Sequence, residues 1–231
     1  YYQNHTQIRH FFIIDTNMRL YAHIFKLTFN KTKNYLQSNL TFNFFLRLIS
    51  FDVLYITNSY ITNVPSFFAN QPIVLEKLLK SIGCDFSLVV IPDFLFENMV
   101  VKEGDYERIE VEEEMVIDIR SEWEELDDYI SSLKKKYRNK VKRIIKNTSS
   151  LEMKNLTDCD LENYAKDIQK LFNQVAVSSQ FKGPEFNTSS FILFVKQGFM
   201  RVNGYFLEDN LVGFSSEMQK ENELYSYFVG F

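Results

Sequence analysis

Apolar residues recur at intervals of three and four positions between residues 121 and 147. This period places them on one face of a helix. No Gly or Pro interrupts the segment, and Ser121 followed by Glu124 fits a capping box. We therefore predict one uninterrupted helix, about 40 Å long, with its apolar face buried. That face consists of Trp123, Leu126, Ile130, Leu133, Tyr137, Val141 and Ile144.

The charged residues of the same segment are separated by sign, with acids in the first turns and bases in the last turns. This order suits the helix dipole, so a solvated basic end is one interpretation. The other is a phosphate-binding strip, because cations four residues apart share a face and repel one another unless an anion neutralises them. An acidic run of the same chain, Glu112–Glu114, could supply that anion. The residues assigned to the strip are Arg138, Lys142, Arg143 and Lys146.

Before this segment, the pattern indicates a hairpin and then a strand–helix–strand unit. Two runs rich in β-branched and aromatic residues flank the polar turn Asp15–Asn17. Pro72 suits the first position of a helix, and Gly83 suits the position just after its end. The apolar runs on either side of that helix should be parallel strands, because a crossover helix joins them. The expected elements are strands at 9–14, 19–29, 51–57 and 86–91, a helix at 73–82, and an extended stretch at 106–119.

After residue 147 the pattern indicates helices followed by a strand meander. A short strand comes first, then one helix with apolar residues at helical spacing, then a shorter helix that ends at Gly198. Three alternating strands follow, joined by short polar turns, and this arrangement predicts antiparallel pairing. The expected elements are strands at 151–156, 201–207, 211–219 and 223–231, and helices at 158–177 and 191–197.

Composition places the chain among globular proteins and limits its partners. The net charge is −4, so bulk attraction to nucleic acid or to a membrane is not expected. Cys84 and Cys159 show no metal-ligand spacing, and neither do His5, His10 and His23 near the start, so we expect no metal site. No apolar run reaches the length of a membrane span and no signal peptide is visible. We therefore expect a cytoplasmic location.

Two distant parts of the chain resemble each other. FFIIDTNMRLYAHIFKL (11–27) and GYFLEDNLVGFSSEM (204–218) both read as a strand, an Asp/Asn turn and a second, alternating strand. A further apolar strand follows each one, FDVLYIT in the first case and LYSYFVGF in the second. Internal similarity of this kind indicates two related halves.

On these residues, the chain resembles the tandem GNAT-fold acyltransferases, and within them the Fem-like aminoacyltransferases and related acetyltransferase-like families. The segment YISSLKKKYRNKVKRIIK (129–146) is similar to the basic helix that those families place between their halves. GYFLEDNLVGFSSEM is similar to the central GNAT hairpin, and LYSYFVGF to the strand whose splayed end admits the acyl-CoA arm. The resemblance implies an α/β fold with mixed sheets in two GNAT-like halves, at 1–120 and 148–231, joined by a helix at 121–147.

The chain departs from this family at the pyrophosphate loop, where glycines let backbone N–H groups reach phosphate. The corresponding stretch of the first half, SYITNVPSFFANQ (59–71), contains no Gly. We therefore expect that the first half does not bind CoA. In the second half the loop would begin after Phe231, so we expect a fragment of a longer protein with an incomplete cofactor site.

The resemblance implies an N-acyltransferase that moves an acyl or aminoacyl group from a thioester or ester donor to an amine acceptor. The donor would be acyl-CoA, with aminoacyl-tRNA as the alternative. The acceptor would be a small molecule or a nucleotide-linked substrate. Two other functions remain open from the sequence. One is a non-catalytic GNAT-like module that binds a nucleotide-linked substrate, and the other is an RNA-binding protein that uses the basic helix.

The resemblance also implies where a site would lie. The acyl-donor arm should pair with the main chain of Phe228, Val229 and Gly230, where Gly230 permits close approach. Glu217 is a candidate general base, and a solvent-facing strand glutamate is the alternative. Tyr225 and Tyr227 could protonate a leaving thiolate, and packing in an aromatic core is the alternative. The basic strip should lie within reach of the cleft between the halves.

Overall fold

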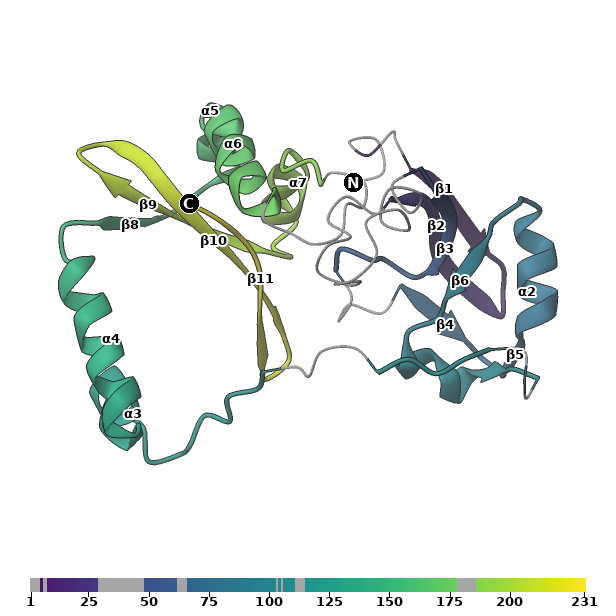
Figure 1. Cartoon of the computed structure of the whole chain (residues 1–231), viewed down its shortest axis with the longest axis horizontal. Coiled ribbons are helices and arrows are strands. Elements are labelled where there is room, and N and C mark those ends of the chain that lie inside the picture. The colour runs from purple at the N-terminus through teal and green to yellow at the C-terminus, as the bar shows by residue number, and fades with distance from the viewer. Residues whose placement is uncertain are drawn as a thin grey trace.

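The described residues form two larger sheets, each with its own helices, and a helical arm beside the second sheet (Figure 1). The computed structural model describes residues 5, 8–28, 48–61, 66–102, 104, 106–110, 115–177 and 186–231. We call the described residues between 8 and 102 the N-terminal unit, those between 126 and 147 the arm, and those between 151 and 231 the C-terminal unit. The presence of helices together with several sheets agrees with the expected α/β class.

The N-terminal sheet begins with the predicted hairpin and has the strand order β1-β2-β3-β6, with β4 paired to β2. The Asp15 carboxylate accepts the backbone N–H groups of Asn17 and Met18, both at 2.7 Å, and so closes the turn. β3 and β6 pair in parallel, as the strand–helix–strand pattern predicted. The strands are β1 (Arg9–Ile14), β2 (Met18–Thr28), β3 (Ser50–Ile56), β4 (Phe67–Ala69) and β6 (Leu88–Val90).

The crossover between β3 and β6 carries the helix α2 (Leu75–Ile82), which buries Leu78 and Ile82 against the sheet. The helix ends at Gly83 in the left-handed conformation, with φ 63°, as predicted. It begins two residues later than its expected start at Ile73. The reason is that β5 (Ile73–Val74) pairs in parallel with β7 (Met99–Val100), which follows the 3₁₀ helix η3 (Asp93–Asn98).

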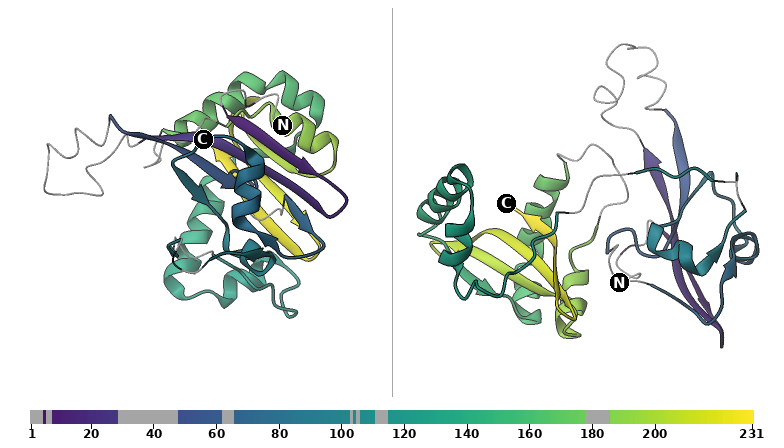
Figure 2. Two further views of the ribbon diagram at one scale, coloured as in Figure 1. Left: turned by 90° about the vertical axis from the view of Figure 1, so that its right-hand side faces the viewer. Right: turned by 90° about the horizontal axis from the view of Figure 1, so that it is seen from below.

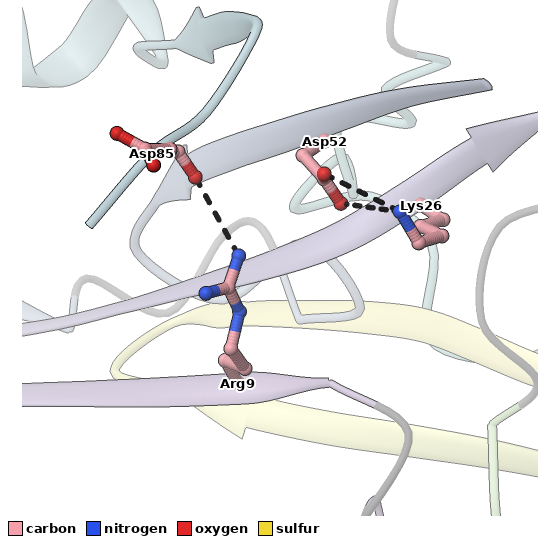
Figure 3. Close-up of polar contacts among 4 residues, drawn as sticks. All are labelled: Arg9, Lys26, Asp52 and Asp85. Atoms are coloured by element: carbon pink, nitrogen blue, oxygen red, sulfur yellow. Dashed lines mark hydrogen bonds and ion pairs between the residues drawn. The ribbon is translucent and has the colours of Figure 1, made fainter.

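Polar side chains link neighbouring segments on one side of this sheet (Figure 3). Lys26 on β2 lies directly across from Asp52 on β3, and its Nζ is 3.1 Å from the Asp52 carboxylate. Arg9 on β1 donates to the Asp85 carbonyl, in the segment that leads into β6, at 3.5 Å. The Lys26 side chain is exposed, so we assign that ion pair a contribution of about 1 kcal/mol or less.

The C-terminal sheet is an antiparallel meander with the strand order β11-β10-β9-β8, as the alternating pattern predicted. Among the described residues between β8 and β9, three helices cover one face of the sheet (Figure 1). The helix expected at 158–177 is divided at Tyr164, and Thr157 caps its first part. The elements are β8 (Glu152–Asn155), α5 (Asp158–Asn163), α6 (Ala165–Ala176), α7 (Ser190–Lys196), β9 (Arg201–Leu207), β10 (Asn210–Lys220) and β11 (Glu223–Gly230).

The prediction of one helix over residues 121–147 is wrong. The arm contains two helices, α3 (Leu126–Ser132) and α4 (Lys135–Asn147), separated by extended backbone at Leu133 and Lys134. Local hydrogen bonds favour the break, because the Ser132 hydroxyl donates to the Tyr129 carbonyl and the Arg138 guanidinium donates to the Leu133 carbonyl at 2.9 Å. The capping box also differs from the expected one, since it joins Glu125 and Asp128 rather than Ser121 and Glu124.

The prediction of a buried apolar face on this segment is also wrong. Ile130 is the only buried residue of α3, and α4 has none. Leu126 is 62% exposed, Tyr137 53% and Ile144 49%. The arm lies beside β8, on the side of the C-terminal unit that faces away from the N-terminal unit (Figures 1 and 2). The sheet therefore does not cover α4, and periodicity alone did not reveal this.

The helix α6 packs closely against β11 at Gly230. A Cβ atom at this position would overlap the ring of Phe214 and would lie 2.8 Å from backbone atoms of Leu171 and Phe172 in α6. The side chain of Val229, the preceding residue, is 38% exposed. Gly230 is therefore needed for the approach of α6 to the sheet.

Replacing Gly230 by Ala should lower the free energy of unfolding by about 1–3 kcal/mol, because the added methyl group overpacks the contact between α6 and β11. Denaturant unfolding measures this change. Val229→Ala is the matched control and should cost about 0.5 kcal/mol or less, as expected for a partly exposed position. Equal losses in the two variants would contradict the close approach of α6.

Candidate functional site

The edge strand β11 contains a one-residue bulge. Ser215 pairs with Val229 and Glu217 with Ser226, so Tyr227 and Phe228 together face the single residue Ser216 of β10. The Phe228 N–H donates to the Ser216 hydroxyl at 2.9 Å, which holds the bulge in place. Within the described residues, β11 has a strand neighbour on one side only. Bulges at sheet edges often re-aim a backbone or side chain beside a functional site.

The three residues expected to bind the acyl donor differ in their surroundings. Phe228 packs into the core, where its ring stacks on Phe186 with 4.5 Å between centroids and 17° between planes. Val229 is partly exposed and points to the other face of the sheet. Gly230 is buried against α6, so the packing of α6 on the sheet already requires its small size. Among the described residues, the side of this segment that has no strand neighbour therefore offers a ligand its backbone rather than its side chains.

The three candidate catalytic side chains do not lie together. Glu217 pairs across the sheet with Arg201, with 3.6 Å between the carboxylate and the guanidinium, and its side chain is 26% exposed. Tyr225 lies opposite the buried Met218, on the helix-covered face, and donates to the carboxylate of Glu223. Tyr227 packs against the core of the C-terminal unit. The strand pleat places Glu217 on the opposite face from Tyr225.

The basic strip divides into one engaged residue and three exposed ones. Arg138 donates to the Leu133 carbonyl and so stabilises the junction of α3 and α4. Lys142, Arg143 and Lys146 are exposed on α4, and none forms an ion pair with a carboxylate of the described residues. Glu112–Glu114, the expected internal partners, lie outside the described residues.

We had expected the strip to lie within reach of the cleft between the two halves, but it does not face the contact between the two units. α4 lies beyond β8, on the far side of the C-terminal unit from the N-terminal unit (Figures 1 and 2). A phosphate group bound there would therefore belong to a different surface from one bound between the units.

Aromatic residues join the two units. Phe186, which precedes α7, contacts His5 with 4.9 Å between ring centroids and Tyr60 with 5.2 Å. The backbone N–H of Asn187 donates to the ring of His5 at 3.0 Å. His5 is 1% exposed, so this contact lies in the interior of the molecule. Ile61 belongs to the same core as α7 and β9–β11, although it follows β3 in sequence.

A chain of hydrogen bonds leads from this contact across the N-terminal hairpin. The Ser59 hydroxyl is 2.8 Å from His23 Nε2, and His23 Nδ1 is 2.9 Å from the Tyr21 hydroxyl. The same hydroxyl is 2.8 Å from His10 Nδ1, and His10 Nε2 is 3.0 Å from the His5 carbonyl. The strand register explains this alignment, because His10 on β1 lies directly across from His23 on β2.

The last bond of this chain fixes the direction of the others when both rings are neutral. A carbonyl can only accept, so His10 Nε2 carries the proton and His10 Nδ1 is an acceptor. Tyr21 therefore donates to His10 and accepts from His23 Nδ1–H. This leaves His23 Nε2 as an acceptor, and Ser59 donates its hydroxyl proton to it. We did not predict this arrangement from the sequence. The signal for it was the presence of His10, Tyr21 and His23 on two strands that were expected to pair.

The pKa of His23 departs strongly from its ordinary value. Burial, followed by the nearby His10 and His5, lowers it from 6.5 to about 3. The ring is fully buried, so charging it would hold a cation away from water. His23 is therefore neutral in the folded protein at ordinary pH.

Comparison of this chain with protein-family models, with curated proteins and with solved structures finds no match. In the described part of the chain, no helix has the length and apolar content needed to cross a membrane. Within the same residues, no group of three or more His, Cys, Asp or Glu side chains is arranged to hold a metal ion.

The low pKa of His23 predicts a pH-dependent stability. Between about pH 3 and pH 6.5, the unfolded chain binds a proton that the folded chain does not, so the free energy of unfolding should rise with pH. The slope due to one proton is at most about 1.4 kcal/mol per pH unit. Denaturant unfolding at several pH values should show a steeper rise for the wild type than for His23→Asn. Parallel curves for the two proteins would contradict the low pKa.

Proposed function

We propose that the chain is a GNAT-like N-acyltransferase that moves an acyl or aminoacyl group from a thioester or ester donor to an amine. The observation that carries this proposal is the bulge in β11, a strand that has a paired neighbour on one side only among the described residues. It lies in an antiparallel sheet whose helices are inserted between the first two strands. In the fold that the sequence resembles, a splayed strand at this position admits the acyl-donor arm. The N-terminal unit supports the tandem arrangement, because β1, β2 and β3 form an antiparallel meander as β9, β10 and β11 do.

The chemistry assigned to this edge uses the backbone. The donor arm would pair along the open side of β11 as an added strand, with its carbonyl near the bulge at Tyr227 and Phe228. A backbone N–H group further along the open side of β11 would stabilise the oxyanion that forms when the amine attacks, because the Phe228 N–H is already donated to the Ser216 hydroxyl. Acyl-CoA is the first donor to test, and aminoacyl-tRNA is the alternative donor. The amine acceptor is a small molecule or a nucleotide-linked compound.

A second candidate function is a non-catalytic module that binds a nucleotide-linked substrate. The observation that favours it is the exposed set of Lys142, Arg143 and Lys146, which has no carboxylate partner among the described residues. An anionic ligand at α4 would neutralise the set without any chemistry at β11. The two functions therefore predict different ligand specificities.

Calorimetric titration with acetyl-CoA and with a nucleotide-sugar at low salt separates them. The acyltransferase proposal predicts that the wild type binds acetyl-CoA. Changing Lys142 and Arg143 together to Ala should weaken binding of the phosphate-bearing ligand that uses the strip by about tenfold, or roughly 1.4 kcal/mol. The matched control changes Lys77 and Lys80 on α2 to Ala, which removes the same charge from the N-terminal unit, and should leave binding unchanged.

Each contrary result has a separate meaning. If neither ligand responds to the Lys142 and Arg143 change, the strip serves solubility or the helix dipole and the phosphate assignment is wrong. If no acyl donor binds and the nucleotide-sugar does, the binding module replaces the transferase. Salt-dependent binding of RNA, with no affinity for either small ligand, would favour the RNA-binding alternative.

A further inference from the structure

Ser59 lies where the two units meet. It is separate from the residues that we assign to the donor site at β11 and to the basic strip on α4. It follows β3 in a turn in which the Tyr60 N–H donates to the Asn58 side chain at 2.9 Å. Ser59 is partly exposed, while its partner His23 is fully buried. The hydroxyl and the imidazole are 2.8 Å apart, which is the distance expected for a nucleophile and its base.

We propose that Ser59 is a nucleophile that accepts an acyl group from an ester or thioester, with His23 as its base and Tyr21 and His10 as a relay behind it. The direction of the hydrogen bonds supports this assignment. With both rings neutral, the Ser59 O–H points to His23 Nε2, so one lone pair of its oxygen is free to face a carbonyl carbon. His23 is held in this tautomer by Tyr21, as a third group orients the base in other nucleophile–base pairs.

The relay accounts for every proton in the acylation step. The Ser59 oxygen forms a bond to the acyl carbon, and its proton passes to His23 Nε2. The Nδ1 proton of His23 passes to the Tyr21 oxygen, and the Tyr21 proton passes to His10 Nδ1. His10 then carries both ring protons and the positive charge. When the C–S or C–O bond of the donor breaks, the leaving thiolate or alkoxide recovers one proton by the reverse sequence.

The placement of charge in this sequence agrees with the burial of the two rings. His23 gains one proton and loses another, so it never holds the cation that its low pKa disfavours. The charge resides on His10, which is less buried than His23. A single buried histidine with so low a pKa would be a poor general base by itself. The relay removes this difficulty because it moves the charge away from the buried ring.

The backbone beside Ser59 is strained. Thr57, two residues earlier, has φ 84°, which is uncommon for any residue with a side chain and more so for a β-branched one. Its side chain is fully buried, and its hydroxyl has no hydrogen-bond partner in the described structure. Backbone strain and an unsatisfied polar atom both cost free energy, and strained residues cluster at functional sites. Both features here lie at the end of β3, next to the proposed nucleophile.

The first test is covalent labelling with p-nitrophenyl acetate, followed by intact-mass measurement and peptide mapping. The proposal predicts that one acetyl group is added and that it maps to Ser59. Ser59→Ala should lose this label, while Ser132→Ala, which removes an exposed serine on α3, should keep it. Absence of any label on Ser59, or equal labelling of the Ser59→Ala protein, would overturn the proposal.

The second test separates the relay from a structural role of the same residues. His10→Asn keeps an oxygen that can accept from Tyr21 but cannot take a proton, and Tyr21→Phe removes the link between the rings. Each should slow acetylation of Ser59 by about a hundredfold, the lower end of the range for general acid–base catalysis. The wild-type rate should depend on pH through the relay, and His10→Asn should abolish this dependence.

Thermal unfolding identifies any variant that fails to fold, and His10→Asn is the more conservative of the two. A folded His10→Asn protein that labels at the wild-type rate with the wild-type pH profile would overturn the relay. The labelling of Ser59 and the binding of acetyl-CoA at β11 are independent measurements. Failure of one therefore does not imply failure of the other.

Discussion

The packing of Phe186 between the two sheets is the contact on which the rest of the structure depends. One side of its ring stacks on Phe228 at the bulge of β11, and other parts of it contact His5 and Tyr60. Phe186 is 2% exposed, so the contact is dry, and its loss would leave a cavity shared by both units. Because Phe228 occupies this cluster, the bulge turns its side chain inward and leaves the backbone of β11 at the edge.

The same cluster lies between the two sites that we propose. On the side of the C-terminal unit it supports the open edge of β11, to which we assign the acyl donor. On the side of the N-terminal unit it supports the turn after β3, where Ser59 meets His23. The basic residues of α4 belong to neither side. An aromatic cluster, rather than a cleft lined by cations, therefore joins the two units.

Local signals predicted most of the fold, and the failures have physical causes. The hairpin turn at Asp15, the helix end at Gly83 and the C-terminal meander were predicted correctly, because each is decided by a few neighbouring residues. The arm was predicted wrongly because burial of its apolar face depends on what lies against it, and periodicity does not contain that information. The histidine chain was missed because it requires the register of β1 on β2 and a contact between His23 and Ser59, which are 36 positions apart.

Hydrogen exchange of Phe186→Ala measured by mass spectrometry tests the central role of this contact most directly. The substitution should cost about 3–5 kcal/mol, and it should increase exchange in both β2 and β11, because the cluster supports both units. Phe68→Ala, which truncates a phenylalanine on β4 that is 55% exposed, is the control and should change neither strand. Faster exchange confined to β11, with β2 as protected as in the wild type, would contradict the account.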